Sequence, residues 1–253
     1  MQFIASQPLG ITQIWGASVK LSTASFTKWL GFILISAVSS ISIGLLNDQL
    51  LSDMPTSPEN APVFSLSSLM LEGGSIILFL LSLVCEIAII YRIDNVANGR
   101  EDSFKAALII GFKKLPSLLL ASILYVIAVA VGCFLLVIPG IIFLFSMGLF
   151  IYFIVIDSLG GYASLKASDK LVWGYWWRNM AVVIVPVIVI LAVTIAMTIL
   201  VALLGINNKS LISVVMNLVS ACFLPYFLTL GYVQFHDLKL RKSGSNVELR
   251  LTK

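Results

Sequence analysis

Glu86 is the side chain in this sequence best placed for chemistry, because it is an acidic residue inside a long apolar stretch, residues 73–91. An ionised carboxylate in hydrocarbon costs several kcal/mol, so such residues often mark a path for ions or protons, or become protonated. Ser75 and Ser82 are helical neighbours that extend a polar stripe from it. Two hypotheses follow for Glu86. It serves transport or proton transfer, or it fixes helix packing as a protonated or hydrogen-bonded carboxyl.

Asn217 is the second polar candidate inside an apolar stretch. With Ser213 and Ser220 it forms an i−4, i, i+3 face within residues 211–235. Hydrogen bonds between helices in membranes contribute about 0.6–2 kcal/mol each. We expect Asn217 to join helices, and we keep a polar intramembrane site around Glu86 and Asn217 as the alternative.

Recognisable catalytic motifs are missing from the sequence. His236 is the single histidine, which argues against a histidine-based metal site. Gly160 and Gly161 are not followed by the Lys-Ser/Thr of a phosphate loop, and Gly-x-Ser-x-Gly is absent. The three cysteines have no metal-ligand spacing. We therefore expect no enzymatic activity, no catalytic residues, no cofactor and no metal.

The elements that must position these side chains are membrane helices. Hydrophobic residues make up 59% of the chain, charged residues 11%, and the mean hydropathy is +1.05. About 20 apolar residues suffice to cross roughly 30 Å of hydrocarbon. We predict an all-α integral membrane protein, a six-transmembrane-helix bundle that forms a single polytopic domain over residues 1–253. The predicted spans are 29–46, 73–91, 115–137, 141–156, 179–204 and 211–235.

Pro139 and Gly140 are expected to form the turn of a helical hairpin. Residues 115–156 contain no charge. As one helix they would reach about 63 Å, roughly twice the bilayer core. Proline stops a helix and glycine permits a turn, so we place the break at this pair.

Lysine and arginine are distributed unequally between the two sides of the membrane. Of the 16 basic residues, fifteen fall in segments that alternate to one side, and only Lys209 lies opposite. Cytoplasmic loops retain Lys and Arg, so we expect both termini in the cytoplasm and residues 236–253 as a basic, disorder-prone cytoplasmic tail. The positive charge flanks the spans, as expected for contact with anionic lipid, so we expect no nucleic acid partner.

Amphipathic helices are predicted at the cytoplasmic membrane surface. Their apolar periodicity places them at residues 11–27, 103–113 and 162–178. The last segment ends in an aromatic cluster that consists of Trp173, Tyr175, Trp176 and Trp177. Clusters of this kind lie at headgroup level.

Residues 137–178 resemble the YciC-type family of uncharacterised bacterial inner-membrane proteins. The matching features are the apolar-Pro-Gly-Ile turn at Val137–Ile141, the Ala-Ser helix at Gly161–Ser168, and Leu171–Trp173. A similar turn and helix occur in other polytopic families, including the membrane domain of some glycerophosphodiester phosphodiesterases. The resemblance implies a bacterial inner-membrane location and brings no catalytic residues.

Two functions remain open from the sequence. The first is a non-enzymatic role in envelope integrity or membrane assembly, with membrane lipids and other inner-membrane proteins as candidate partners. The alternative is a small transporter or lipid-handling protein that uses the polar intramembrane site around Glu86.

Overall fold

The structure, a computed structural model, describes residues 7–52, 66–204 and 209–251, and all regular secondary structure in this part of the chain is α-helix. The elements are α1 Ile11–Ser52, α2 Leu66–Ala97, α3 Phe104–Leu135, α4 Val137–Met147, α5 Phe150–Val155, α6 Gly161–Val172, α7 Trp176–Leu203 and α8 Lys209–Leu251. The all-α class predicted from the sequence is confirmed for these residues.

Within the described residues, six segments are long and apolar enough to cross a membrane. They are Ile11–Leu46, Leu69–Ala97, Phe104–Leu135, Val137–Val155, Trp176–Val201 and Val214–Gly244. The predicted number of spans is therefore confirmed by length and composition. Residues 205–208, between the fifth and sixth predicted spans, lie outside the described residues, as do Pro55, Pro58 and Pro62 between the first two spans.

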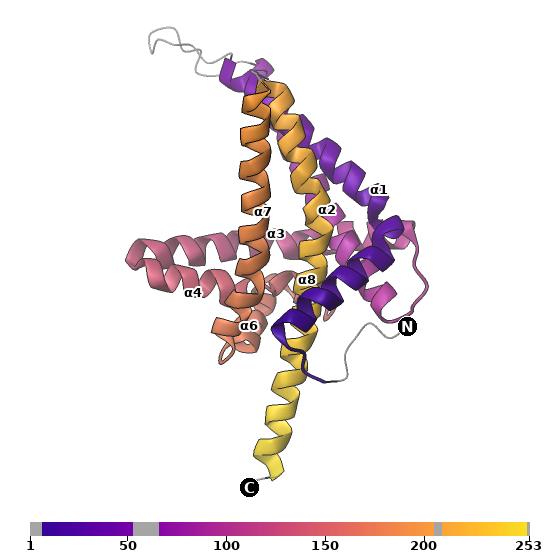
Figure 1. The fold of residues 1–253 in the computed structure, drawn as a ribbon, viewed down its shortest axis with the longest axis vertical. Helices are drawn as coiled ribbons and strands as arrows, with labels where there is room; N and C mark the ends of the chain where they lie inside the picture. The colour runs from indigo at the N-terminus through magenta and orange to yellow at the C-terminus, as the bar shows by residue number, and fades with distance from the viewer. Residues whose placement is uncertain (1–6, 53–65, 205–208, 252–253) are drawn as a thin grey trace.

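The helices run in two directions. Figure 1 shows α7, α8 and the later part of α1 along the length of the molecule, whereas α3 and α4 run across it as an antiparallel pair. The sequence predicted a six-helix bundle but not that α3 and α4 cross the other long helices. The tip of the crossing pair is apolar and open, with Phe134 89% exposed. In a membrane protein such surface is covered by hydrocarbon.

Two of the predicted interfacial helices are parts of longer helices. Residues 11–27 form the first part of α1. Residues 104–113 form the first part of α3, which continues past Pro116. In α1 the reason is a continuous buried face: Ile14, Leu21 and Trp29 are at most 1% exposed and recur at helical spacing. That face packs against α2 and α8, so these residues pack against protein.

The predicted disorder-prone tail is also helical, because α8 continues from the last span to Leu251. Asp237 and Leu238, which follow the apolar stretch, are 2% and 1% exposed. Lys239 on the same helix is paired with Asp157, with 2.6 Å between Nζ and Oδ2. Tertiary contacts therefore order a segment whose composition is that of a solvated tail.

The third predicted interfacial helix is a separate element, α6, but it is shorter than expected. It ends at Val172, and Gly174 with φ +93° turns the chain into α7 at Trp176. Only glycine adopts this conformation without strain. Helix α6 packs against α3, α4 and α5, and so lies beneath the crossing pair.

Candidate functional site

Glu86 lies in α2 between residues that are fully buried, and its own side chain is partly buried. Among the described residues it has no hydrogen-bond or ion-pair partner. Ser75 donates to the carbonyl of Leu71 and Ser82 to the carbonyl of Phe79, both in their own helix. The expected polar stripe is therefore not joined to Glu86 by hydrogen bonds.

Glu86 and Asn217 lie at different depths in the structure. Helices α2 and α8 begin at the same end of the molecule (Figure 1), and they meet where Tyr232 Oη donates to Asp94 Oδ1 at 2.9 Å. At 1.5 Å per residue, Glu86 is about 12 Å before this contact and Asn217 about 22 Å before it. The two residues are therefore offset by about 10 Å along the helix axes.

The helical hairpin turns three residues earlier than expected. The helix breaks at Leu136, which is extended with φ −161° and ψ 140°. Pro139 lies in the first turn of α4, where its missing N–H costs no hydrogen bond. Gly140 faces α3, where an added Cβ would overlap Cys133. Gly140 therefore permits close packing of the pair, whereas Leu136 makes the turn.

The three tryptophans divide between two environments. Trp173 and Trp177 are 66% and 74% exposed. Trp176 packs against the core, makes an edge contact with Phe145, and donates its Nε1–H to the carbonyl of Ile142 at 3.4 Å. Trp176 thus joins α7 to α4, whereas Trp173 and Trp177 lie at the protein surface.

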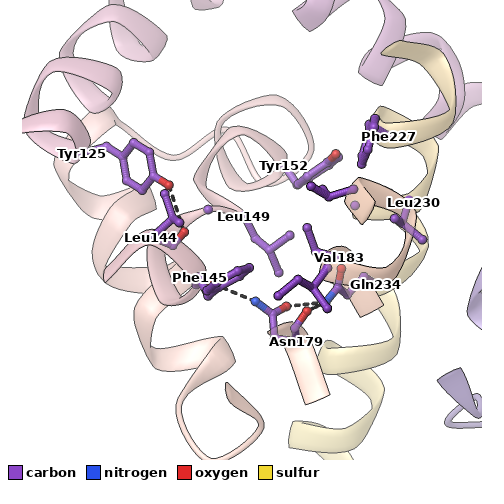
Figure 2. A pocket seen from close by; sticks show the side chains of 14 residues that line it. Tyr125, Leu144, Phe145, Leu149, Tyr152, Asn179, Val183, Phe227, Leu230 and Gln234 are labelled. Atoms are coloured by element: carbon purple, nitrogen blue, oxygen red, sulfur yellow. Dashed lines mark hydrogen bonds between the residues drawn. The ribbon is translucent and has the colours of Figure 1, made fainter. Parts of the chain in front are cut away.

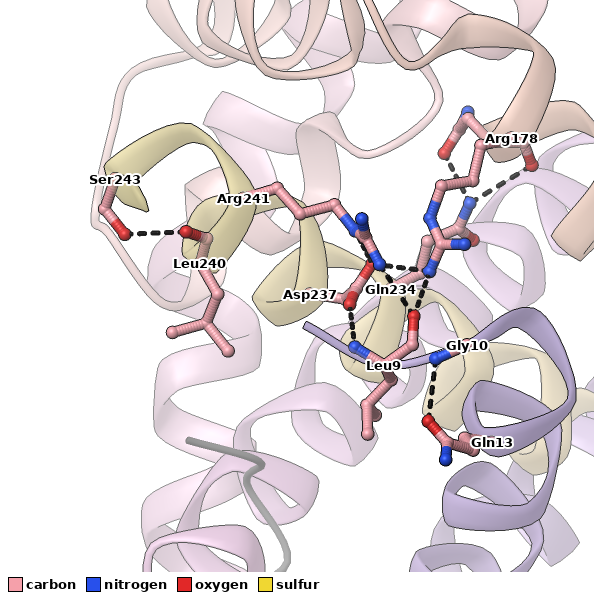
Figure 3. A network of polar contacts seen from close by, with 10 residues as sticks. Leu9, Gly10, Gln13, Arg178, Gln234, Asp237, Leu240, Arg241 and Ser243 are labelled. Carbon is pink, nitrogen blue, oxygen red and sulfur yellow. Dashed lines mark hydrogen bonds and ion pairs between the residues drawn. The ribbon is translucent and has the colours of Figure 1, made fainter. Parts of the chain in front are cut away.

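Asp237 is the centre of a buried polar cluster that sequence reasoning did not find (Figure 3). Its side chain is 1% exposed. It accepts hydrogen bonds from the backbone N–H of Leu9 at 2.7 Å and from Arg178 and Arg241 at 2.9 Å each. Both arginines also donate to the Leu9 carbonyl, at 2.5 and 2.7 Å. The only signal in the sequence was the i, i+4 spacing of Asp237 and Arg241.

A second ion pair joins α2 to the connection before α3. Arg92 binds Asp102 through two nitrogens, with the shortest contact 2.6 Å, and both side chains are at most 10% exposed. The Arg92 guanidinium also lies 5.7 and 6.0 Å from the rings of Phe32 and Phe104. Several of the fifteen basic residues on the predicted cytoplasmic side thus pair with other residues of the protein.

A cavity of about 430 Å³ opens between the base of the hairpin, α5, α7 and α8 (Figure 2). Most of its walls are apolar, and neither Glu86 nor Asn217 lines it. Its polar floor is a pair of buried amides: Gln234 Nε2 donates to Asn179 Oδ1, and Asn179 Nδ2 donates to the Phe145 carbonyl at 2.8 Å. Sequence reasoning missed this pair, because each amide lies near the end of a predicted span.

The chain is similar to a curated bacterial membrane protein. It is 28% identical over 146 residues to a UPF0259 membrane protein of Pectobacterium carotovorum, a match that covers 56% of this chain. The resemblance to the YciC-type family is therefore confirmed. The match spans 57% of the relative's length. No protein-family model matches the chain, and no solved structure matches it. The protein is thus a multi-pass membrane protein similar to an uncharacterised bacterial family.

Proposed function

We propose that this protein is a non-enzymatic component of the bacterial inner membrane that supports envelope integrity or membrane assembly. The observation that carries the proposal is the use of its charged side chains. Asp237 with its two arginines, and Arg92 with Asp102, are buried and hold distant segments together. Groups so engaged stabilise a fixed arrangement of helices and are not free to bind a transported ion.

The proposed orientation has both termini in the cytoplasm. Its support is the fifteen-to-one distribution of basic residues. In Figure 1, α6 and the first turns of α1 lie in the lower half of the view, and the last turns of α8 extend below them. On α6, Lys166 and Lys170 are exposed and Tyr162 is 67% exposed, and Trp173, which directly follows the helix, is 66% exposed. This combination fits contact with anionic headgroups, so α6 is the proposed interfacial helix.

The orientation is tested with a reporter enzyme that is active only outside the cytoplasm. Fusion after Ser57 is expected to give activity, and fusion after Lys242 to give none. A fusion that is cytoplasm-active, placed at the same two sites, provides the matched control. The reverse pattern would overturn the orientation.

The envelope role is tested by deletion and complementation. A strain without the protein is expected to lose viability or leak periplasmic enzymes under osmotic and detergent stress. The wild-type chain should restore resistance, and a chain with Asp237→Asn should restore it less well. Normal envelope behaviour in the deletion strain, together with no recoverable membrane partner, would count against the proposal.

A lipid-handling role is the second candidate, and the cavity is the observation that favours it. A volume of about 430 Å³ with apolar walls and few polar groups is within the usual range of small-molecule sites, about 300–1,000 Å³. Transport around Glu86 has less support, because Glu86 does not line this cavity.

A further inference from the structure

We propose that the cavity between the hairpin, α7 and α8 binds an uncharged lipid through a single hydroxyl group, which donates a hydrogen bond to Gln234 Oε1. The proposal goes beyond the envelope role, since it assigns a ligand class and a recognition atom to a site of its own.

Among the described residues that line the cavity, Gln234 Oε1 is the buried side-chain polar atom that has no hydrogen-bond partner. The residue is 2% exposed, and this oxygen has no hydrogen-bond partner in the described part of the chain. Figure 2 shows Gln234 at the lower wall of the cavity, its oxygen turned toward the space between Val183 and Leu230. Leaving a buried acceptor unpaired is unfavourable, so a donor from a ligand would be gained at little cost.

The orientation of this amide is fixed by its neighbours. Gln234 Nε2 lies 3.1 Å from the backbone carbonyl of Asn179 and also donates to Asn179 Oδ1. A carbonyl can only accept, so the nitrogen must face Asn179 and the oxygen must face the cavity. The Asn179 amide is fixed in turn, because its nitrogen donates to the carbonyl of Phe145. This series of hydrogen bonds therefore leaves Gln234 Oε1 as the acceptor without a donor.

The other polar groups of the cavity wall already have partners for their donors. Tyr125 donates its hydroxyl to the Leu144 carbonyl, and Tyr152 donates to the Leu228 carbonyl, each at 2.9 Å. None of the described residues that line the cavity is charged, so a cationic or anionic group would be buried there without a counter-ion. A water molecule needs two to four polar partners, which is more than the one free acceptor of this cavity. An apolar body with one hydroxyl therefore fits the walls and the acceptor together.

The cavity opens toward the surface that hydrocarbon covers. Ile184 and Val187 of α7 line it and are 38% and 44% exposed. Their helix lies within a candidate span, so a lipid chain can enter sideways from the bilayer. Diacylglycerols and polyprenols both have an uncharged apolar body with one hydroxyl.

The test compares two ligands that differ in one donor. The purified full-length protein in detergent is labelled with a photoreactive diazirine derivative of hexadecanol. Unlabelled 1-hexadecanol and its methyl ether then compete with the label. Because the ether cannot donate, we expect the alcohol to compete about 3–10-fold better. The label should map to α4, α7 and α8. Equal competition by alcohol and ether, or labelling elsewhere, would overturn the proposal.

Matched variants separate recognition from folding. Gln234→Leu removes the acceptor and should reduce the alcohol-to-ether ratio to about 1. Asn217→Leu removes an amide from the same helix outside the cavity and should keep the wild-type ratio. Val183→Phe fills the cavity but leaves both amides intact, so it should reduce labelling even if Gln234→Leu fails to fold. Unchanged labelling of Val183→Phe would contradict the site.

Two further competitors identify the source of the ligand. Competition by dioleoylglycerol supports a glycerolipid, and competition by undecaprenol supports an isoprenoid alcohol. If neither they nor hexadecanol displace the label, the site does not bind this class. A deletion strain with a normal envelope would leave these binding results unaffected, so the two proposals fail separately.

Discussion

Asp237 in α8 accepts a hydrogen bond at 2.7 Å from the backbone N–H of Leu9, which precedes it by 228 residues. The same carboxylate binds one arginine from α7 and one from its own helix, and both arginines return to the Leu9 carbonyl. One buried acidic side chain thus holds the segment before α1 against α7 and α8. Few other contacts in the described residues join parts of the chain so far apart in sequence.

Asp237→Asn should destabilise the protein by about 3 kcal/mol. Breaking a buried ion pair leaves charges without a partner, which costs about 3–5 kcal/mol. The lower value is expected because Arg178 and Arg241 keep 19% and 23% of their side chains exposed. The measurement is the unfolding free energy of the purified protein in detergent, followed by circular dichroism.

Asp157→Asn is the control for this prediction. It breaks a pair with Lys239 whose side chains are 30% and 36% exposed, and such pairs contribute about 0–1 kcal/mol. If the two variants lose the same stability, the cluster around Asp237 does not have the role assigned to it.

Arg92→Lys should lower stability by about 1.5–3 kcal/mol, although it conserves the charge. Lysine cannot make the two-nitrogen contact with Asp102, and it stacks less well beside Phe32 and Phe104. Arg100→Lys is the matched control: its side chain is 62% exposed and makes one contact of 3.0 Å with Asp94. Urea or heat denaturation of both variants would decide this, and equal losses would contradict the prediction.

Hydropathy and charge predicted the membrane class and the six spans, because both properties are summed over many residues. Single contacts were harder to foresee. Asp237 and Leu9 are far apart in sequence, and only the tertiary fold brings them together. Gln234 and Asn179 read as polar residues at the ends of spans, and nothing local indicates that they pair. Such pairings depend on how helices cross, which periodicity does not specify.

In the hairpin, the sequence correctly indicated the region of the turn, but the roles predicted for the proline and the glycine were wrong. Pro139 and Gly140 mark the right region, but the break falls at Leu136. Proline is tolerated in the first turn of a helix, so it indicates a helix start as well as a stop. Glycine allows both sharp turns and close helix contacts, and here Gly140 allows a close contact between α3 and α4. Residue type alone does not separate these roles.

Gly140→Ala should destabilise the hairpin by about 1–3 kcal/mol. An added methyl group would overlap Cys133, and an alanine at Gly132 would approach the Gly140 Cα to 2.8 Å, so neither helix has space to yield. Gly16→Ala in α1 provides the contrast, because no atom lies within 4 Å of its added Cβ. In a helix interior that change should stabilise by about 0.5–1 kcal/mol. Opposite signs in thermal unfolding are expected, and a neutral Gly140→Ala would refute the close packing.

Substitutions of Glu86 distinguish most clearly between a packing role and a transport role. In the structure its carboxyl has no hydrogen-bond or ion-pair partner among the described residues, and it does not line the cavity. Glu86→Gln and Glu86→Leu should therefore both insert and fold, and Leu should be at least as stable as wild type because a buried polar group is removed. Both variants should restore stress resistance to a deletion strain.

A proton-coupled role for Glu86 requires a different result. Gln keeps the shape of the side chain but cannot titrate, so both variants would fold normally and both would fail to complement. A hydrogen-bonded packing role requires a third result, in which Gln is tolerated and Leu is destabilising, because a partner would lose its bond. Measuring unfolding and complementation on the same two variants distinguishes all three. The absence of a bonded partner in the described residues favours tolerance of both.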